Sequence, residues 1–269
     1  MGYKLRKVLV PSLPKGAPDI RILHFSDLHL TPNRKKEIKF IKSWVTLKPD
    51  LVVSTGDFLA HRDAVETVLD SLDELLNLPG LYVFGSNDYY SPRFKNPLTY
   101  LGKNYGTHKL GAKLPTEVLE SKLTRRGWIN LNNRRTAISI RGLDIDVRGT
   151  NDAHLGLDDY SKIQGKPKSD FSIGVTHAPY DRVLDSMKRD GVELILAGHT
   201  HGGQIRFPGF RRSYAITTNC DLPNWRARGL TRIGSDPWLN VSAGVGSSPF
   251  VPFRIFCSSE VSIITLTNE

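Results

Sequence analysis

Six short apolar runs recur along the chain, and each one stops at a carboxylate, an amide or an imidazole. Turn residues bound every run, which is typical of short buried β-strands. The runs cover residues 20–25, 51–53, 81–84, 145–147, 171–175 and 194–197. In an open α/β sheet, ligands bind beyond the carboxyl ends of the strands. The pattern therefore predicts that polar side chains from distant segments meet at one edge of a sheet.

Helical periodicity fills several of the gaps between these strands. Apolar residues recur at three- and four-residue steps over residues 62–78, and a weaker stripe covers residues 34–47. Pro179 is placed to begin a helix that Gly191 ends, and another short helix is expected near residues 117–125. Strands that alternate with helices predict an α/β fold.

Length and composition fit one ordinary globular domain. The chain has 269 residues, of which 39% are hydrophobic and 24% charged, and the strand pattern extends along its whole length. We therefore expect a single domain over residues 1–269, with residues 91–127 as an insertion over one rim. Cys220 and Cys257 are too few for a disulfide framework, so we expect two unpaired thiols in a reducing compartment, with one disulfide as the alternative.

The sequence contains no run of about 18 apolar residues, and its basic start lacks the apolar core of a signal peptide. We expect a cytoplasmic protein that can sit peripherally at the inner face of the membrane. The net charge is +10, and residues 91–135 hold ten Lys and Arg against Glu117 and Glu120. This basic rim attracts an anionic membrane surface or a polyanion, or it is a solvated flank. The absence of helix-turn-helix, zinc-finger and aromatic RNA-binding patterns excludes a dedicated nucleic-acid module.

Seven polar side chains at the predicted strand ends form a set that suits divalent cations. They are Asp27, His29, Asp57, Asn87, His177, His199 and His201. Asp57 can bridge two cations because a carboxylate has two oxygens. The first cation would be completed by Asp27, His29 and His201, and the second by Asn87, His177 and His199. Such a mixed shell favours Mn, Fe, Zn, Co or Ni over Ca or Mg alone, and two cations about 3.5–4 Å apart can hydrolyse phosphoesters.

Five short blocks in the same order resemble the calcineurin-like metallophosphoesterase superfamily. The blocks are DLH at 27–29, GD at 56–57, GSND at 85–88, THAP at 176–179 and GHTHGGQ at 198–204. The resemblance implies a four-layer αββα sandwich, in which two facing β-sheets lie between helices and the two-metal site sits at one end. It implies the ligand roles given above. The most similar branch is a small bacterial one whose members are often membrane-associated and act on phosphoesters or lipid-linked pyrophosphates.

The GSND block departs from the superfamily's usual Gly-Asn-His-Asp or Gly-Asn-His-Glu, in which the Asn binds the second metal and the His protonates the leaving group. A comparison without gaps places Ser86 at the Asn position, whereas a shift of one residue places Asn87 there and Asp88 at the His position. We prefer the shift because an amide oxygen is a better ligand than a neutral hydroxyl, which leaves Ser86 to contact the substrate. Asp88 beside two cations should have a lowered pKa and be a weak acid, and His61 is a second candidate acid.

The leading interpretation is a metal-dependent phosphohydrolase that cleaves a phosphoester or pyrophosphate bond with a hydroxide activated by two metals. Its substrate would be a phosphorylated small molecule or a lipid-linked phosphate, with a leaving group that needs little protonation. Arg206 is expected to bind phosphate oxygens, and Asp152 and His154 are expected beside the ligands. The alternatives are a catalytically weak metal- or anion-binding scaffold of the same fold and a peripheral membrane binder that uses the basic rim.

Overall fold

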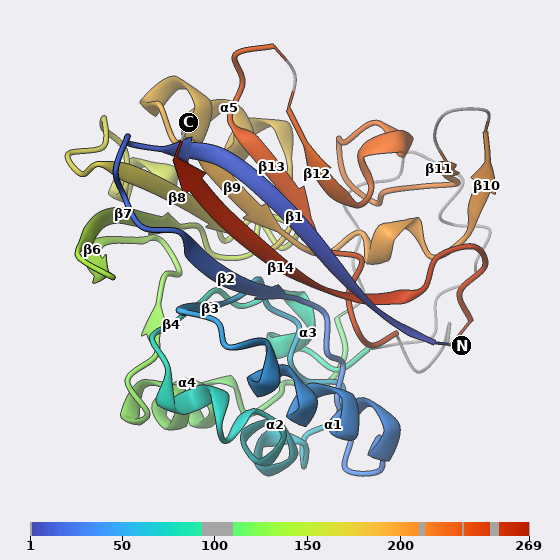
Figure 1. Cartoon of the computed structure of the whole chain (residues 1–269). Helices are drawn as coiled ribbons and strands as arrows, with labels where there is room; N and C mark the ends of the chain where they lie inside the picture. The colour runs from blue at the N-terminus through green and yellow to red at the C-terminus, as the bar shows by residue number, and fades with distance from the viewer. Residues whose placement is uncertain (1, 93–109, 210–212, 233, 248–252, 269) are drawn as a thin grey trace.

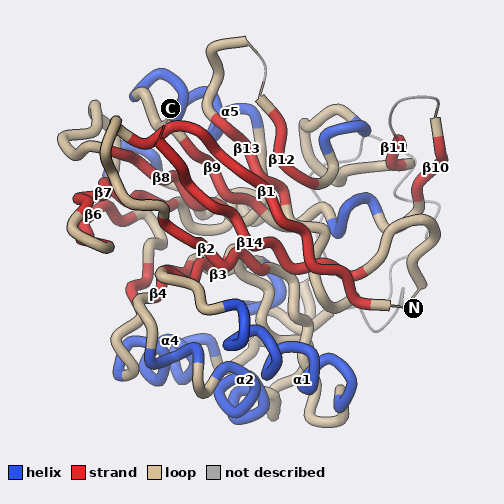
Figure 2. The backbone as a smooth tube through the Cα atoms, in the orientation of Figure 1, coloured by secondary structure: helices blue, strands red, loops and turns tan. Residues whose placement is uncertain are grey.

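The computed structural model describes residues 2–92, 110–209, 213–232, 234–247 and 253–268, which form two β-sheets with helices on their outer faces (Figures 1 and 2). The first sheet has the order β1 (Tyr3–Leu13), β14 (Ser259–Asn268), β2 (Ile20–Phe25), β3 (Leu51–Ser54), β4 (Gly80–Tyr82) and β5 (Ile129–Asn130). The second has the order β12 (Gly229–Thr231), β13 (Trp238–Val241), β9 (Leu194–Ala197), β8 (Phe171–Thr176), β7 (Leu143–Gly149) and β6 (Arg134–Ile140). A separate small sheet pairs β10 (Arg206–Pro208) with β11 (Ser213–Ala215).

Most strands near the site run parallel, so their carboxyl ends reach the same edge. In the first sheet, β2 pairs with β3, β3 with β4 and β4 with β5 in parallel. In the second, β7 pairs with β8, β8 with β9 and β9 with β13 in parallel. The edge at which the polar residues were expected to gather is therefore a real feature of both sheets.

The helices complete four layers. The α-helices are α1 (Lys35–Lys42), α2 (Val65–Leu72), α3 (Ser86–Tyr89), α4 (Thr116–Arg125) and α5 (Asp181–Asp190). The short 3-10 helices are η1 (Ser43–Leu47), η2 (Leu75–Asn77), η4 (Tyr160–Lys162), η5 (His201–Gly203) and η6 (Asn224–Arg226). Helices α1, α2 and α4 lie together outside the first sheet, and α5 lies on the opposite side of the molecule (Figure 1). The predicted α/β sandwich is confirmed.

Strict alternation along the strands divides the apolar side chains between the layers. In β2, Ile20 and Ile22 join the cluster between the two sheets, whereas Leu23 and Phe25 join the cluster under the helices. Successive side chains of a strand point to opposite faces, so a strand that is apolar throughout must be covered on both sides. The same division places Ala197 of the second sheet against α5.

The last part of the expected insertion packs against the first sheet. Within it, α4 buries Leu119 and Leu123 against the first sheet, and β5 follows as the strand at the edge of that sheet. Residues 93–109 lie outside the described part of the chain. Part of the positive charge of the basic rim is neutralised in the folded protein, because Lys122 pairs with Glu66 of α2.

Three further expectations can be compared with the structure. Cys220 and Cys257 are both buried and form no disulfide bond, as expected. Among the described residues, no helix has the length and apolar character needed to cross a bilayer. The periodic segment 62–78 does not form one helix, because α2 ends at Leu72 and the chain continues into the 3-10 helix η2.

Candidate metal centre

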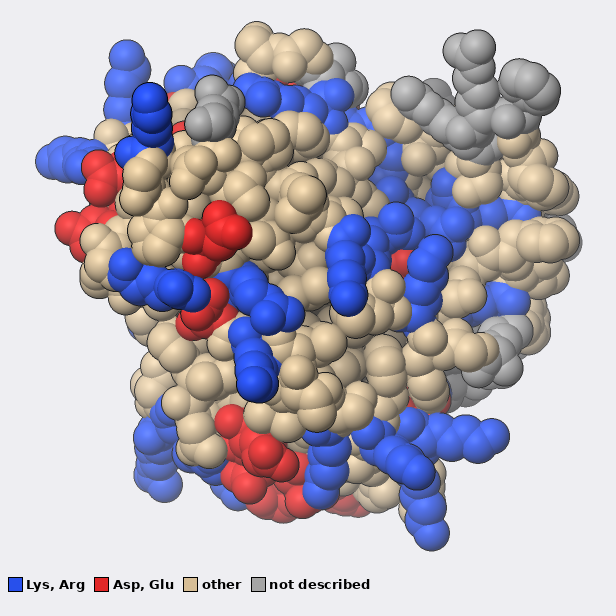
Figure 3. Space-filling view, viewed as in Figure 1, with Lys and Arg blue, Asp and Glu red and all other residues tan. Residues whose placement is uncertain are grey.

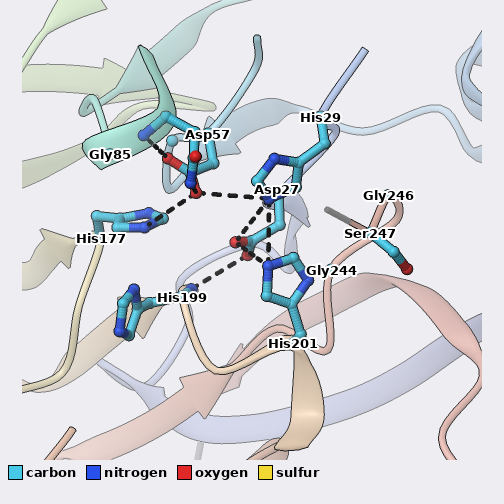
Figure 4. A network of polar contacts seen from close by, with 12 residues as sticks. Asp27, His29, Asp57, Gly85, His177, His199, His201, Gly244, Gly246 and Ser247 are labelled. Carbon is cyan, nitrogen blue, oxygen red and sulfur yellow. Dashed lines mark hydrogen bonds and ion pairs between the residues drawn. The ribbon is translucent and has the colours of Figure 1, made fainter. Parts of the chain in front are cut away.

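Most of the predicted ligands lie in turns that follow strands of both sheets, and Figure 4 shows the side chains of Asp27, His29, Asp57, His177 and His201 converging. Five of the predicted ligands have a positive φ: Asp27 (53°), His29 (43°), Asp57 (58°), His199 (69°) and His201 (49°). A left-handed backbone is uncommon for residues other than glycine, and such residues gather at functional sites. The turns therefore accept an unfavourable backbone conformation in order to direct these side chains.

Asp27, His29 and His201 form the first group of potential ligand atoms. The Nε2 atoms of His29 and His201 are 3.2 Å apart, and Asp27 Oδ1 lies 3.8 Å from the former and 3.3 Å from the latter. One ligand atom from each residue lies within 4.8 Å of the others. Two imidazole nitrogens and a carboxylate oxygen that face one point are a donor set that suits a divalent transition metal.

Asp27, Asp57 and His177 form a second group with the same mutual spacing of 4.8 Å or less. Asp57 Oδ2 lies 3.5 Å from His177 Nε2 and also 3.5 Å from His29 Nε2 of the first group. Asp27 belongs to both groups, and Asp57 of the second group also approaches His29 of the first; the role of Asp57 as a bridging ligand stays a prediction.

Several polar atoms of these groups are buried without a hydrogen-bond partner in the described structure. They are Asp27 Oδ1, His29 Nδ1 and His177 Nε2. Buried polar atoms are almost always satisfied, so an orphan calls for an explanation. His177 Nδ1 lies 2.6 Å from the carbonyl oxygen of Thr55 and must donate to it. In the neutral ring the lone pair is then on Nε2, which faces Asp57, so the residues present fit a bound cation.

His199 and Asn87 lie beside the two groups rather than within them. The His199 main-chain N–H donates to Asp27 Oδ2 at 3.1 Å, and its Nε2 lies 3.0 Å from the carbonyl oxygen of Asn219. If Nε2–H donates to that carbonyl, Nδ1 carries the lone pair that a metal would need. The main-chain N–H and the Nδ2 of Asn87 both donate to Asp57, at 2.8 and 2.7 Å. Asn87 thus orients Asp57, and its role as a ligand stays a prediction.

Glycine allows the turns to approach one another closely. A Cβ on Gly85 would lie 2.3 Å from Asp57 Oδ1 and 2.6 Å from His177 Nδ1. Real Cβ atoms essentially never come so close, so Gly85 is the residue that lets the turn after β4 touch both neighbours. Gly246 serves the same purpose on the other side, where a Cβ would lie 2.1 Å from the carbonyl oxygen of Leu28.

Asp88 does not take the position of an acid, which corrects the sequence-based expectation. Its carboxylate is fully buried and accepts four main-chain N–H groups, from Asp57 (2.8 Å), Phe58 (2.7 Å), Leu59 (3.2 Å) and Gly85 (3.0 Å). Burial, followed by the charge of Asp57, raises its pKa to about 7. Asp88 fastens the turn after β3 to the turn after β4.

His61 and Arg206 also differ from their predicted roles. His61 is half exposed, and its Nδ1 accepts the main-chain N–H of Asp63 at 3.2 Å, so it behaves as a solvated loop residue. Arg206 is buried, and its guanidinium donates to the Gly202 carbonyl oxygen at 2.8 Å and to Ser213. These contacts use the guanidinium to hold the turn after β9 rather than to bind phosphate. Ser86 begins α3, and its contact with substrate stays a prediction.

Arg254 was not singled out by the sequence, although it braces the metal centre. It is buried and donates to the carbonyl oxygens of His201 (3.3 Å), Ala243 (2.7 Å) and Gly246 (2.5 Å). A lone arginine far along the chain from the histidines gives no signal of this contact. Arg254 thereby ties the turn of His201 to the segment that packs beneath Asp27.

Asp152 and His154 border the second group, as expected. The rings of His154 and His199 lie 4.6 Å apart, and His154 Nδ1 is 2.9 Å from the hydroxyl of Tyr180. Asp152 is fully buried, and its Oδ2 has no hydrogen-bond partner in the described structure. These residues extend the polar wall of the site from the end of β7.

Buried carboxylates dominate the electrostatics of the site. Burial acts to lower the pKa of His177, but the nearby carboxylates, Asp57 foremost, outweigh it and raise that pKa to about 9. Burial lowers the pKa of His201 to about 3, which keeps this ring neutral at neutral pH. Burial raises the pKa of Asp152 to about 6. A cation would supply the positive charge that this group of buried carboxylates lacks.

The chain was compared with family models, curated proteins and solved structures. The sequence model of the family described as calcineurin-like phosphoesterase matches residues 20–203. The chain is 28% identical over 264 residues to the uncharacterized metallophosphoesterase YkuE of Bacillus subtilis (strain 168), which covers 95% of this chain and 82% of YkuE. It is 25% identical over 263 residues to the phosphodiesterase YaeI of Escherichia coli (strain K12), and the alignment covers 93% of this chain and 83% of YaeI. Among solved structures, phosphopantetheinyl hydrolase from Mycobacterium tuberculosis matches with a TM-score of 0.46 and 12% identity, over 87% and 91% of the two chains.

Proposed function

The chain belongs to the calcineurin-like phosphoesterase family, and we propose that it hydrolyses a phosphoester with two divalent cations held side by side where the two sheets meet. Membership makes the protein a hydrolase that acts on phosphoric ester bonds and uses divalent metal ions. The number of cations, their ligands and the kind of ester go beyond membership and belong to the proposal. A catalytically weak scaffold of the same fold is not favoured.

We assign the first cation to Asp27, His29 and His201, and the second to Asn87, His177 and His199. Asp57 is assigned to both. The observation that carries this assignment is the position of Asp57 Oδ2, which is 3.5 Å from His29 Nε2 and 3.5 Å from His177 Nε2. A single carboxylate oxygen equidistant from ligands of both groups is what a shared ligand requires.

When bound, the cations would neutralise the charge that develops on phosphoryl oxygens. They would also lower the pKa of water enough to provide a hydroxide nucleophile near neutral pH. The chain's own residues hold the arrangement in place. Thr55 fixes the ring of His177 through its carbonyl oxygen, and Asn87 fixes Asp57 through two hydrogen bonds. Asp88 and His61 do not supply an acid. We therefore propose a substrate whose leaving group needs little protonation, such as an aryl phosphate or a pyrophosphate.

Metal analysis of Asp57→Asn tests the assignment without relying on turnover alone. The amide keeps the shape of the side chain but loses the charge that two cations would share. We expect bound metal to fall from two ions per chain towards one, and hydrolysis of bis-p-nitrophenyl phosphate with added Mn²⁺ to fall by roughly a thousandfold. Asp63→Asn, a matched change at an exposed carboxylate, should leave both unchanged. Wild-type metal content and turnover in Asp57→Asn would rule out the shared-ligand assignment.

A further inference from the structure

The small sheet of β10 and β11 lies beside the metal centre, and an isolated bridge joins a further segment to it. β10 and β11 pair antiparallel, with Phe207 opposite Tyr214. A third segment joins the other side of β10, because Ile205 and Ile255 form a parallel bridge. The Arg206 N–H donates to the Ile255 carbonyl oxygen at 3.0 Å, and the Ile255 N–H donates to that of Gln204 at 2.9 Å. The pair of strands β10 and β11 and the segment around Ile255, which is distant from them in sequence, thus lie side by side.

The two faces of this small sheet differ completely in exposure. Arg206, Ala215 and Arg254 point to the inner face and are buried. Side chains alternate along extended segments, so the neighbouring residues point outward. Phe207 is 60% exposed and Tyr214 48%. The outer face consists of Phe207, Tyr214, Ile216, Phe253 and Ile255, all of which are exposed, and we call it the apolar ledge.

The apolar ledge is built onto the histidine side of the metal centre. On its inner face, Arg206 donates to the Gly202 carbonyl oxygen at 2.8 Å, and Arg254 donates to the His201 carbonyl oxygen at 3.3 Å. Whatever covers the ledge is therefore one sheet thickness away from the turn that carries His201. A patch of large exposed apolar side chains of this kind marks an interaction surface rather than ordinary surface.

Positive charge lies beneath and beside the apolar ledge. Arg6 lies beside Gly229 and Arg228 beside Gly202, the residue whose carbonyl oxygen Arg206 engages, so several guanidiniums lie close together here. The carboxylate that lies among them is Glu260, which Arg6 engages through two hydrogen bonds of 2.6 and 2.7 Å. Figure 3 shows Lys and Arg side chains gathering over β1 and between it and β10. Exposed aromatic and aliphatic side chains with cations around them match the chemistry of an anionic bilayer surface.

We propose that the apolar ledge inserts into the interface of a bilayer that contains anionic lipids and holds the metal centre at that surface. The ledge supplies the apolar contact, and the Lys and Arg side chains that gather over β1 (Figure 3) supply the attraction to lipid phosphates. This surface differs from the basic rim at residues 91–135. On that rim, Lys122 forms an ion pair with Glu66 and Arg126 forms one with Asp73. Binding by the ledge requires neither bound metal nor turnover, so it stands or falls separately from the proposed function.

Vesicle sedimentation of the full chain tests the proposal. We expect the wild type to sediment with vesicles of phosphatidylcholine and phosphatidylglycerol at low salt, and more weakly with phosphatidylcholine alone or at high salt. Phe207→Gln combined with Ile255→Gln should lower the partition coefficient by roughly tenfold or more, because two apolar side chains no longer enter the bilayer. Leu157→Gln, a matched change at an exposed leucine elsewhere, should bind like the wild type. So should Lys113→Gln combined with Arg125→Gln on the basic rim.

A second measurement keeps the proposal testable if the double variant folds poorly. A polarity-sensitive fluorophore on Tyr214→Cys should shift to the blue when anionic vesicles are added, whereas the same label on Leu157→Cys should not shift. The proposal is overturned if the wild type binds neither kind of vesicle, or if the double variant binds as the wild type does. A dimer of the wild type in solution that the double variant loses, without vesicle binding, would instead make the ledge an interface between copies of this chain.

Discussion

The carboxylate side and the histidine side of the metal centre are held in place by different kinds of interaction. On the first sheet, the Asp88 carboxylate gathers four main-chain N–H groups of the turns that carry Asp57 and Gly85. On the second sheet, the turn of His201 is held from outside by the guanidiniums of Arg206 and Arg254. One side is fixed by a buried carboxylate that accepts main-chain N–H groups, and the other by two long side chains that donate to main-chain carbonyl oxygens.

This difference indicates how each side should respond to damage. Loss of the internal fastening leaves several buried N–H groups without acceptors, which lowers the stability of the whole fold. Loss of an external brace leaves the fold intact but lets the histidines move, which lowers metal affinity. The four predictions below test this contrast, from the largest expected effect to the smallest.

Asp88→Ala should have the largest effect on stability. Four main-chain N–H groups would lose their acceptor in a buried position, and we expect the free energy of unfolding to fall by roughly 4 kcal/mol. Urea denaturation followed by circular dichroism measures the change. Asp63→Ala removes an exposed carboxylate and serves as the matched control. A loss of less than about 1 kcal/mol would mean that the carboxylate side does not depend on this fastening.

Gly85→Ala should disturb both sides at once. The new methyl group would lie 2.3 Å from Asp57 Oδ1 and 2.6 Å from His177 Nδ1, so the turns after β3, β4 and β8 must separate. We expect a loss of about 3 kcal/mol in the free energy of unfolding, together with loss of bound metal. Thermal unfolding and metal analysis check the two effects. Gly2→Ala, at a position with no neighbour within 4 Å, should change neither.

Arg254→Lys should affect metal affinity more than stability. An ammonium group cannot reach the several carbonyl oxygens that the planar guanidinium contacts, so the turn of His201 loses its brace. We expect the affinity for Mn²⁺ to fall by roughly ten- to a hundredfold, as measured by competition with a fluorescent chelator. A variant that unfolds as readily as Asp88→Ala would erase the proposed contrast between the two sides.

His24→Gln should produce the smallest effect, and only in acid. Nδ2 of Asn240 on the second sheet lies 2.7 Å from His24 Nδ1 on the first, so this pair links the two sheets. Burial lowers the pKa of His24 to about 3, well below its value in the unfolded chain. Stability from the neutral ring is therefore present above pH about 6.5 and is lost as the pH falls towards 3, by about 1 kcal/mol between pH 7 and 5.5. Denaturation curves of His24→Gln should show that much less acid sensitivity; an unchanged slope would contradict this role.

Much of the fold was predictable because its signals are local. Each expected strand pairs at or near its predicted position, since continuous apolar runs with turn residues around them have few other uses. The gathering of Asp27, Asp57 and His177 was also predictable, because parallel strands bring their carboxyl ends to one edge. In the structure, one ligand atom from each of these three residues lies within 4.8 Å of the others.

The roles of Asp88, Arg206 and Arg254 were not predictable, for a common physical reason. Each role depends on main-chain groups, which are identical in every residue and leave no mark in the pattern. The position of α3 could not be predicted either. This single turn of helix begins at Ser86, and its start determines that Asn87 faces Asp57. A residue pattern cannot fix the phase of so short a helix.

Strand β14 has a consequence for how the protein is made. It lies between β1 and β2, pairing with β1 in parallel and with β2 in antiparallel orientation. During synthesis on the ribosome, β1 and β2 emerge early but remain unjoined until residues 259–268 arrive. The nascent chain must therefore carry two unmatched strand edges through most of translation. Chaperone dependence should consequently be set by the time the ribosome takes to reach β14.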